Sequence, residues 1–242
     1  MIKNKAIVFS FDDGVEQDKR LIEIFDRYGL RCTFNLNSGM FGMHTSHEAM
    51  LFGEMRVFNN RRIPRAECKE VYRNHEVAAH SVTHPILPAL SDEDLIWQMR
   101  EDARTLEEVT EKGICGFAYP GGYCTYFDER TATLISQNTD LYYGRTAKSS
   151  YSFSLPDNLM IFHPTVSHRE IEIRDRLAEE FLTLETEEPQ LFYIWGHSYE
   201  LDVDEKIWAQ FERFCERIAG RKDILYATTD EAFRHFGLKK GD

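Results

Sequence analysis

The sequence of 242 residues lacks several features that mark specialised classes of protein. It has no apolar run near the roughly 20 residues of a membrane-spanning helix, which argues against a membrane protein. No Gly/Ser/Pro-rich linker, repeat or low-complexity stretch divides it, so we expect one domain over residues 1–242. Positive charge is scarce: 29 Lys and Arg against 41 Asp and Glu give a net charge of -12, which argues against a nucleic-acid partner.

Cysteine is also sparse and forms no disulfide-like pattern. There are five cysteines, an odd number, with no C-x-x-C motif: Cys32, Cys68, Cys115, Cys124 and Cys215. This pattern is typical of free thiols in a reducing compartment and predicts a cytoplasmic protein. The apolar stretch near the basic start spans only residues 6–9, whereas a signal peptide needs roughly 7–15. We therefore expect a strand there; the sequence leaves the oligomeric state open.

Apolar residues make up 42% of the chain and occur in short runs that alternate with helical patterns. Short runs of β-forming residues predict strands over residues 6–11, 32–36, 77–79, 114–119, 141–143, 191–195 and 223–227. Helical spacing predicts helices between them, over residues 16–28, 91–113, 129–137, 170–184, 204–219 and 229–236. Seven or eight such units indicate an α/β fold with a parallel sheet, closed into a barrel. Residues 37–65 are least regular and predict a long loop over the active face or a short strand pair.

Two adjacent carboxylates, Asp12 and Asp13, end the first predicted strand in the run Phe9-Ser-Phe-Asp-Asp-Gly. Neighbouring side chains on an extended strand point to opposite faces. Both carboxylates can serve one site only if the chain leaves the extended conformation, which Gly14 allows. The alternative is an ordinary turn in which an Asp caps the next helix.

Two histidines, His80 and His84, follow the predicted strand at residues 77–79. Histidines four residues apart reach one metal ion if the chain turns between them. Pro85 disfavours a helix at His84, so we expect a loop. The alternative is a pair of surface histidines, and we interpret His44 and His47 as solvated loop residues of that kind.

Two further motifs also follow predicted strands. His197 ends the strand at residues 191–195 and is suited to act as a general acid, although a hydrogen-bonded rim histidine is the simpler interpretation. In Phe117-Ala-Tyr-Pro-Gly-Gly, backbone N–H groups near Gly121 and Gly122 are candidates to stabilise an oxyanion, and an ordinary loop is the alternative. All four motifs lie at the carboxyl ends of strands, where α/β barrels place their active sites. An Asp-His-His set with one open position is typical of hydrolytic zinc or related divalent-metal sites.

The order and spacing of these motifs resembles the polysaccharide deacetylase family (carbohydrate esterase family 4). Its T/S-F-D-D-G motif matches residues 10–14, its H-S/T-x-x-H motif matches residues 80–84, and two later motifs match residues 117–122 and 193–197 loosely. The resemblance implies a distorted (β/α) barrel of seven or eight strands and metal-dependent hydrolysis of acetyl groups on carbohydrate. It implies these roles: Asp12 as general base, Asp13, His80 and His84 as metal ligands, Ser81 as the brace of their loop, and His197 as general acid.

The sequence departs from the family pattern at two places. The third-motif Arg is replaced by Ala118, and Arg145 after the next strand is the candidate to supply its charge. The fourth motif, an Asp-Trp pair, is not recognisable. Glu200 or Asp202 is a candidate to orient His197, but we interpret both as solvated acids.

The remaining candidates are aromatic residues and histidines near these motifs. Tyr119 is a supporting candidate in the third motif. Trp195 and Tyr199 are candidates to stack on a sugar, although a Trp on a strand is more often core. We interpret His163 and His168, candidates for the site rim, as hydrogen-bonded loop residues.

The leading hypothesis is a metal-dependent hydrolase that removes N- or O-linked acetyl groups from a carbohydrate or a small acetylated sugar derivative. Its cofactor would be one divalent ion, with zinc favoured and cobalt, nickel or manganese compatible with the same ligands. One alternative is a metal-independent hydrolase of a small cyclic amide or imide in the same fold. Another is a carbohydrate-binding protein without turnover.

Overall fold

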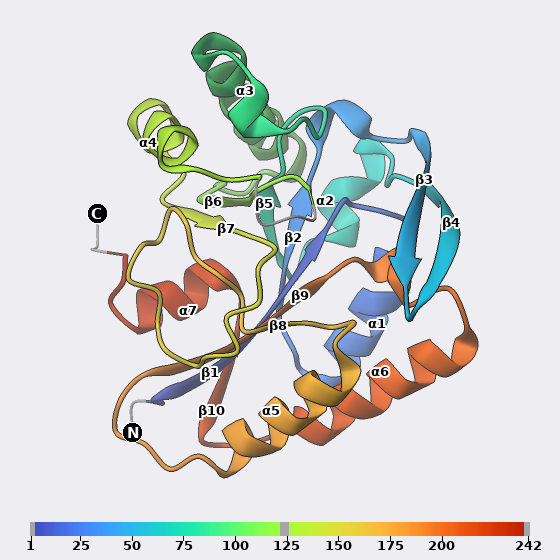
Figure 1. The fold of residues 1–242 in the computed structure, drawn as a ribbon, viewed down its shortest axis with the longest axis vertical. Coiled ribbons are helices and arrows are strands. Elements are labelled where there is room, and N and C mark those ends of the chain that lie inside the picture. Colours follow the sequence, from blue (N-terminus) through green and yellow to red (C-terminus); the bar gives the residue numbers. More distant parts are fainter. Residues whose placement is uncertain (1–2, 122–125, 240–242) are drawn as a thin grey trace.

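A curled parallel sheet organises the protein (Figure 1), in a computed structural model that describes residues 3–121 and 126–239. Its central strand is β1 (Lys5–Asp12), which pairs with β2 (Cys32–Leu36), β9 (Gln190–Gly196) and β10 (Ile224–Ala227). The sheet continues on both sides, through β5 (Glu76–Ala79), β6 (Gly116–Ala118) and β7 (Tyr143–Arg145) beyond β2, and through β8 (Val166–Ser167) beyond β9. Because all these pairings are parallel, the strand carboxyl ends meet at one end of the sheet.

The sheet forms a distorted (β/α) barrel rather than the closed barrel that the unit count alone predicts. β2 pairs with residues 9–12 of β1, whereas β10 pairs with residues 5–8 along the same strand. The opening between β7 and β8 is spanned by one parallel bridge between Arg145 and Phe162. Around that bridge, the Phe162 amide donates to Gly144 at 3.0 Å and the Thr146 amide donates to Phe162 at 2.9 Å.

Every residue of β1 is buried, because the strand lies between the barrel interior and the surrounding helices. Phe9 and Phe11 of β1 pack against Phe25 and Phe211, with ring centroids 4.7 to 6.2 Å apart. This aromatic core fixes the outward helices α1 and α6 against the strand that carries the first motif.

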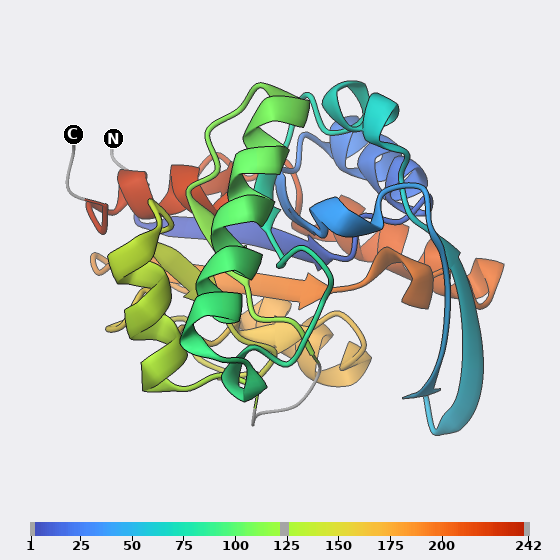
Figure 2. The ribbon, with the colours of Figure 1, turned by 90° about the horizontal axis from the view of Figure 1, so that it is seen from above.

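Helices surround the sheet (Figures 1 and 2): α1 (Asp18–Tyr28), α2 (Cys68–Val71), α3 (Asp92–Thr110), α4 (Glu129–Asn138), α5 (Ile171–Thr183), α6 (Glu205–Ile218) and α7 (Thr229–His235). Four 3-10 turns lie between them: η1 (Ser38–Met40), η2 (Arg65–Glu67), η3 (Leu87–Ala89) and η4 (Ser198–Glu200). The Ser91 hydroxyl accepts the Asp94 amide at 3.2 Å, which caps α3 as the sequence predicts.

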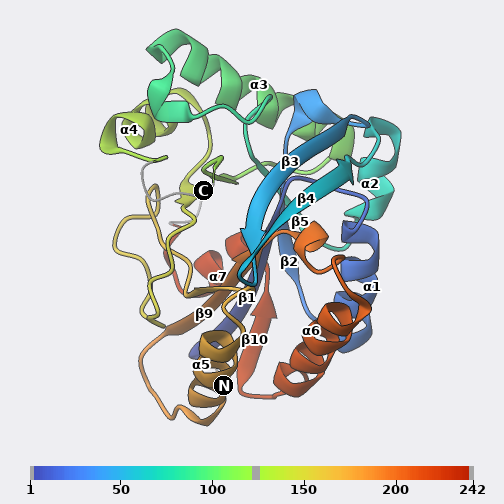
Figure 3. The same ribbon diagram turned by 45° about the vertical axis from the view of Figure 1, so that its right-hand side comes forward.

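The irregular segment contains a strand pair, one of the two arrangements expected there. β3 (His44–Leu51) and β4 (Glu54–Arg61) form an antiparallel hairpin that stands out from the barrel (Figures 2 and 3). His44 is exposed, but His47 is half-buried against Phe58 and Tyr199, with ring centroids 5.4 and 5.2 Å away. The prediction of a solvated loop is therefore wrong for His47, because the hairpin folds its inner face onto the barrel.

Within residues 3–121 and 126–239, no helix has the length and apolar character needed to span a membrane. The four described cysteines, Cys32, Cys68, Cys115 and Cys215, are free thiols, and Cys124 lies outside the described residues.

Candidate active site

The chain brings both carboxylates of the first motif to one end of the barrel by leaving the extended conformation at Asp13. Asp13 has a φ of 87°, and Gly14 follows with a φ of 62°. The turn therefore begins one residue before Gly14, at the aspartate itself. The Asp13 amide donates to the carbonyl of Asn35 at 2.9 Å, which ties the turn to β2.

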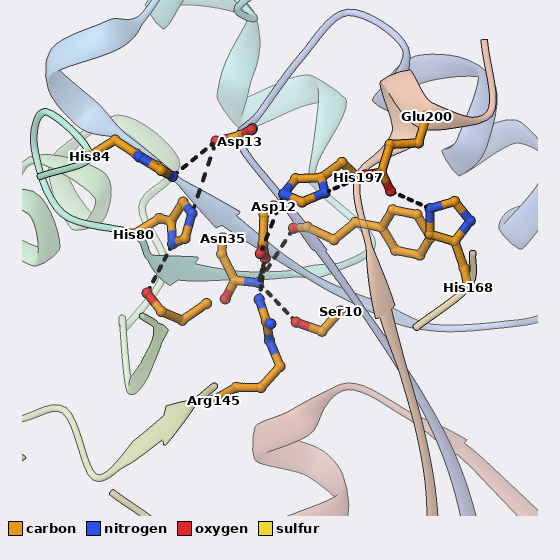
Figure 4. A network of polar contacts seen from close by, with 12 residues as sticks. Ser10, Asp12, Asp13, Asn35, His80, His84, Arg145, His168, His197 and Glu200 are labelled. Atoms are coloured by element: carbon orange, nitrogen blue, oxygen red, sulfur yellow. Dashed lines mark hydrogen bonds and ion pairs between the residues drawn. The ribbon is translucent and has the colours of Figure 1, made fainter. Parts of the chain in front are cut away.

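His80 and His84 meet Asp13 from the loop after β5 (Figure 4). The Nε2 atoms of His80 and His84 lie 3.9 and 3.8 Å from Asp13 Oδ1. Ser81 and His84 also have left-handed backbone, with φ of 64° and 60°. Such conformations cost roughly 1–3 kcal/mol each in non-glycine residues and persist where the surroundings enforce them, often at functional sites.

These three side chains fit a divalent metal ion. One ligand atom from each lies within 4.8 Å of the others. His80 Nδ1 lies 2.9 Å from the carbonyl of Ala118, which only accepts, so Nδ1 carries the proton and the Nε2 lone pair is free. Burial lowers the pKa of His80 to about 4, which keeps the ring neutral. Asp13 Oδ1 is a buried acceptor that receives no hydrogen bond from the described residues.

The loop that carries the histidines is held by Asp102, which sequence reasoning missed. The Asp102 carboxylate accepts the amide of Ser38 at 2.7 Å and that of His80 at 2.8 Å. Burial raises the pKa of Asp102 to about 7. The available signal was its helical spacing with the buried residues Leu95, Met99 and Leu106, which places an acid on the inward face of α3.

Asp12 is fixed through one of its two oxygens. Its Oδ1 accepts from Asn35 Nδ2 at 2.8 Å and pairs with Arg145 of β7. Arg145 is 1% exposed and lies over the Trp195 ring, 4.9 Å from its centroid. Arg145 thus brings a charge to Asp12 in a chain that has Ala118 at the third-motif position. The other oxygen, Oδ2, lies 4.0 Å from His197 Nε2.

Glu200 contacts His197 from the opposite side of the ring (Figure 4). Its Oε1 lies 3.3 Å from His197 Nδ1, and its Oε2 pairs with His168 Nε2 at 2.7 Å. The interpretation of Glu200 as a solvated acid is wrong, since the η4 turn folds it back and leaves it 3% exposed. Asp202 is exposed as expected and accepts from Trp208 Nε1 at 2.9 Å.

The charges around His197 favour its protonated form. Burial alone would lower the pKa of His197, but the charge of Glu200, followed by Asp13 and Asp12, raises it above the ordinary value. The pKa of Glu200 is held well below its ordinary value, because His197 and His168 more than offset the effect of burial. His197 is therefore a buried imidazolium beside a buried carboxylate.

The other candidates occupy the edges of this centre or lie away from it. His168 and His163 are hydrogen-bonded loop residues as expected, His163 to Thr146 Oγ1 at 2.6 Å. Tyr119 is buried and donates to the carbonyl of Met160 at 2.9 Å, and Trp195 is 3% exposed. Tyr199 stacks on His197 at 4.9 Å. Gly121 has a φ of 100°, and Gly122 lies outside the described residues.

A family model described as polysaccharide deacetylase matches residues 2–141, more than half of the chain. The chain belongs to the polysaccharide deacetylase family. This membership makes it a hydrolase of the deacetylase type, and Asp12, Asp13, His80 and His84 all lie in the matched part. Comparison with curated protein sequences gives no match.

Several solved structures of this family share the fold. A putative polysaccharide deacetylase from Mycobacterium smegmatis is 14% identical, with a TM-score of 0.66 over 100% of this chain and 93% of that one. A family 4 carbohydrate esterase from Streptomyces lividans, in complex with acetate, is 15% identical, with a TM-score of 0.57 over 93% of each chain. A pseudoenzyme of the family from Bacillus anthracis is 17% identical, with a TM-score of 0.53 over 96% of this chain and 66% of that one. At these identities the likeness establishes the fold, and function is argued from the site.

Proposed function

We propose that the protein is a divalent-metal-dependent hydrolase that removes an N- or O-linked acetyl group from a carbohydrate or a small acetylated sugar derivative. The observation that carries the proposal is the convergence of two sets of groups at one end of the barrel. Asp13, His80 and His84 present three metal-ligand atoms within 4.8 Å of one another. Beside them, Asp12 Oδ2 and His197 Nε2 face each other at 4.0 Å.

The residues that would hold the ion are Asp13, His80 and His84, through Oδ1 and the two Nε2 atoms. Zinc is the ion we favour, and cobalt, nickel and manganese suit the same nitrogen and oxygen donors. Bound there, the ion would polarise the acetyl carbonyl and lower the pKa of a bound water.

Asp12 and His197 divide the proton transfers between them. Asp12 Oδ1 is occupied by Asn35 and Arg145, so Oδ2 is the oxygen left to take the proton of the attacking water. His197, held as imidazolium by Glu200, gives its Nε2 proton to the departing amine or alkoxide. An amine leaves only when it is protonated, so the acid matters most if the substrate is an amide. Backbone N–H groups near Gly121 or Gly122 remain our candidates for the oxyanion.

Metal content and acetate release test this proposal together. We expect the purified parent to bind one zinc per chain and to release acetate from an acetylated sugar. Asp13→Ala should lose both properties, whereas Asp12→Asn should keep the metal and lose roughly 10²–10⁴-fold in kcat. Parent protein that releases acetate equally well after complete chelation would contradict the metal-dependent mechanism.

One observation favours a second candidate, the metal-independent hydrolase of a cyclic amide or imide. The guanidinium of Arg62 lies 2.9 Å from Asp13 Oδ1, so a positive charge already accompanies this carboxylate. Ring opening of a cyclic amide by chelated protein, without acetate release, would support that candidate instead.

A further inference from the structure

Arg62 is a buried cation at the metal site that none of the motifs includes. It follows β4 at the base of the hairpin, where it forms an antiparallel bridge with Val15 just beyond the first motif. Its side chain is 8% exposed. In the described part of the chain, both polar contacts of its guanidinium go to Asp13, one to the backbone carbonyl and one to Oδ1.

The contact with Oδ1 concerns the oxygen atom that would bind the ion. The same atom lies 3.9 and 3.8 Å from the Nε2 atoms of His80 and His84. A carboxylate oxygen has two lone pairs, so a guanidinium and a metal ion can share it. They would then be two cations on one oxygen in a site that is almost closed to solvent, since the Asp13 side chain is 9% exposed.

The charge balance of the centre points in the same direction. Asp12 is paired with Arg145, and Asp13 is paired with Arg62. Each carboxylate therefore has its own buried arginine, and two negative charges meet two positive ones before any ion arrives. A divalent ion entering this site gains less attraction than it would from an unpaired Asp13, and it is repelled by Arg62.

We propose that Arg62 sets the metal affinity of this site: by sharing Asp13 Oδ1 with the ion, it weakens the binding of the ion and makes it exchangeable. In the metal-free protein, the same contact holds the Asp13 carboxylate in place and compensates its charge. The inference rests on the proposed function only in taking Asp13, His80 and His84 as the metal ligands.

The test is the dissociation constant for Zn²⁺, measured by competition with a chromogenic chelator at one pH and ionic strength. Arg62→Met removes the charge while keeping much of the side-chain volume, and we expect it to bind Zn²⁺ at least tenfold more tightly than the parent. Arg62→Lys keeps the charge and should stay within about threefold of the parent. The matched control is Arg61→Met, which changes net charge equally at an exposed neighbour whose ion pair is with Glu16, at 3.4 Å.

The second readout is the visible spectrum with Co²⁺, which reports whether the same ligands bind in each variant. Affinity in Arg62→Met that equals or falls below that of the parent, with Arg61→Met unchanged, would overturn the inference and leave the metal-dependent function standing. Zinc binding by Arg62→Met alone would support the inference and contradict a metal-dependent parent. Absence of binding in both would overturn both.

The variants remain informative if Arg62→Met does not fold. Arg62→Gln then replaces it, because its amide can still donate to the Asp13 carbonyl. A tenfold gain in affinity in Arg62→Lys would also overturn the inference, since that variant retains the positive charge.

Discussion

The guanidinium of Arg145 pairs with Asp12 across the barrel interior, 133 positions away along the chain. Both side chains are almost completely buried, at 1% and 4% exposure. The third-motif position, Ala118, contributes its carbonyl oxygen to His80 instead of a charge to Asp12. In this chain two residues on adjacent strands, β6 and β7, therefore hold the two halves of the site.

We expect Arg145→Met to be strongly destabilising, because it leaves Asp12 as a buried carboxylate without its cation. Breaking a buried pair on one side costs about 3–5 kcal/mol in the free energy of unfolding. Urea denaturation followed by circular dichroism measures this loss. Arg104→Met is the control: Arg104 is exposed and pairs with Glu101 on the helix surface, so we expect a loss of less than about 1 kcal/mol. Equal losses in the two variants would contradict the buried pairing.

Glu200→Gln should shift the pH profile of the reaction. Glu200 raises the pKa of His197, so His197 keeps its proton to higher pH in the parent than it would alone. Removing this charge lowers the pKa of His197, and the alkaline limb of the kcat profile should move to lower pH. Asp202→Asn, on the same loop but exposed, should leave the limb in place. A limb that does not move in Glu200→Gln would mean that His197 is not the acid.

Much of the fold could be predicted because short apolar runs mark buried strands. β2 lies over Cys32–Leu36 as expected, and α4 differs from its prediction by one residue. β8 was missed, since two residues are too few to form a pattern. The strand predicted at residues 141–143 is observed at Tyr143–Arg145, because the buried charge of Arg145 does not resemble a strand interior.

The site could be predicted only where its residues end neighbouring strands. Asp12, Asp13, His80 and His197 follow β1, β5 and β9, and parallel pairing brings those ends together. The burial of Glu200 and Arg62 depends on partners that are distant in the sequence or on the path of the hairpin, and no local pattern carries that information. The open alternatives for the histidine motif are narrowed by geometry: His80 is 1% exposed and faces Asp13, unlike a surface histidine.

Ser81→Ala should weaken metal binding while preserving the ligands themselves. The Ser81 hydroxyl accepts the His84 amide at 3.1 Å, and this bond holds a turn in which both residues have positive φ. Loss of such a supporting contact typically costs 10–100-fold in metal affinity. Isothermal titration with Zn²⁺ measures the change. Thr83→Ala in the same loop is the control, because the Thr83 hydroxyl accepts from Gln98 and contacts no ligand atom. Equal affinities for both variants would show that the hydroxyl does not position His84.

Asp18 should make the folded state less stable as the pH rises. It is fully buried beneath the catalytic loop, where it accepts from Ser198 Oγ at 2.5 Å and Tyr72 Oη at 2.7 Å, and burial raises its pKa to about 7. Because the folded-state pKa lies above the unfolded one, its contribution is complete below about pH 4 and is lost as the pH rises to about 7. Each unit of pKa difference corresponds to roughly 1.4 kcal/mol of unfolding free energy.

Urea titrations at pH 5 and pH 8 test this linkage in Asp18→Asn, which carries no titrating group at that position. The variant should lose less stability than the parent between the two pH values. Part of the decline should remain, since Asp102 also has a raised pKa. Glu23→Gln, an exposed change on the same helix, should follow the parent. Parallel pH dependence in the parent and Asp18→Asn would mean that Asp18 ionises in the folded protein as easily as in the unfolded chain.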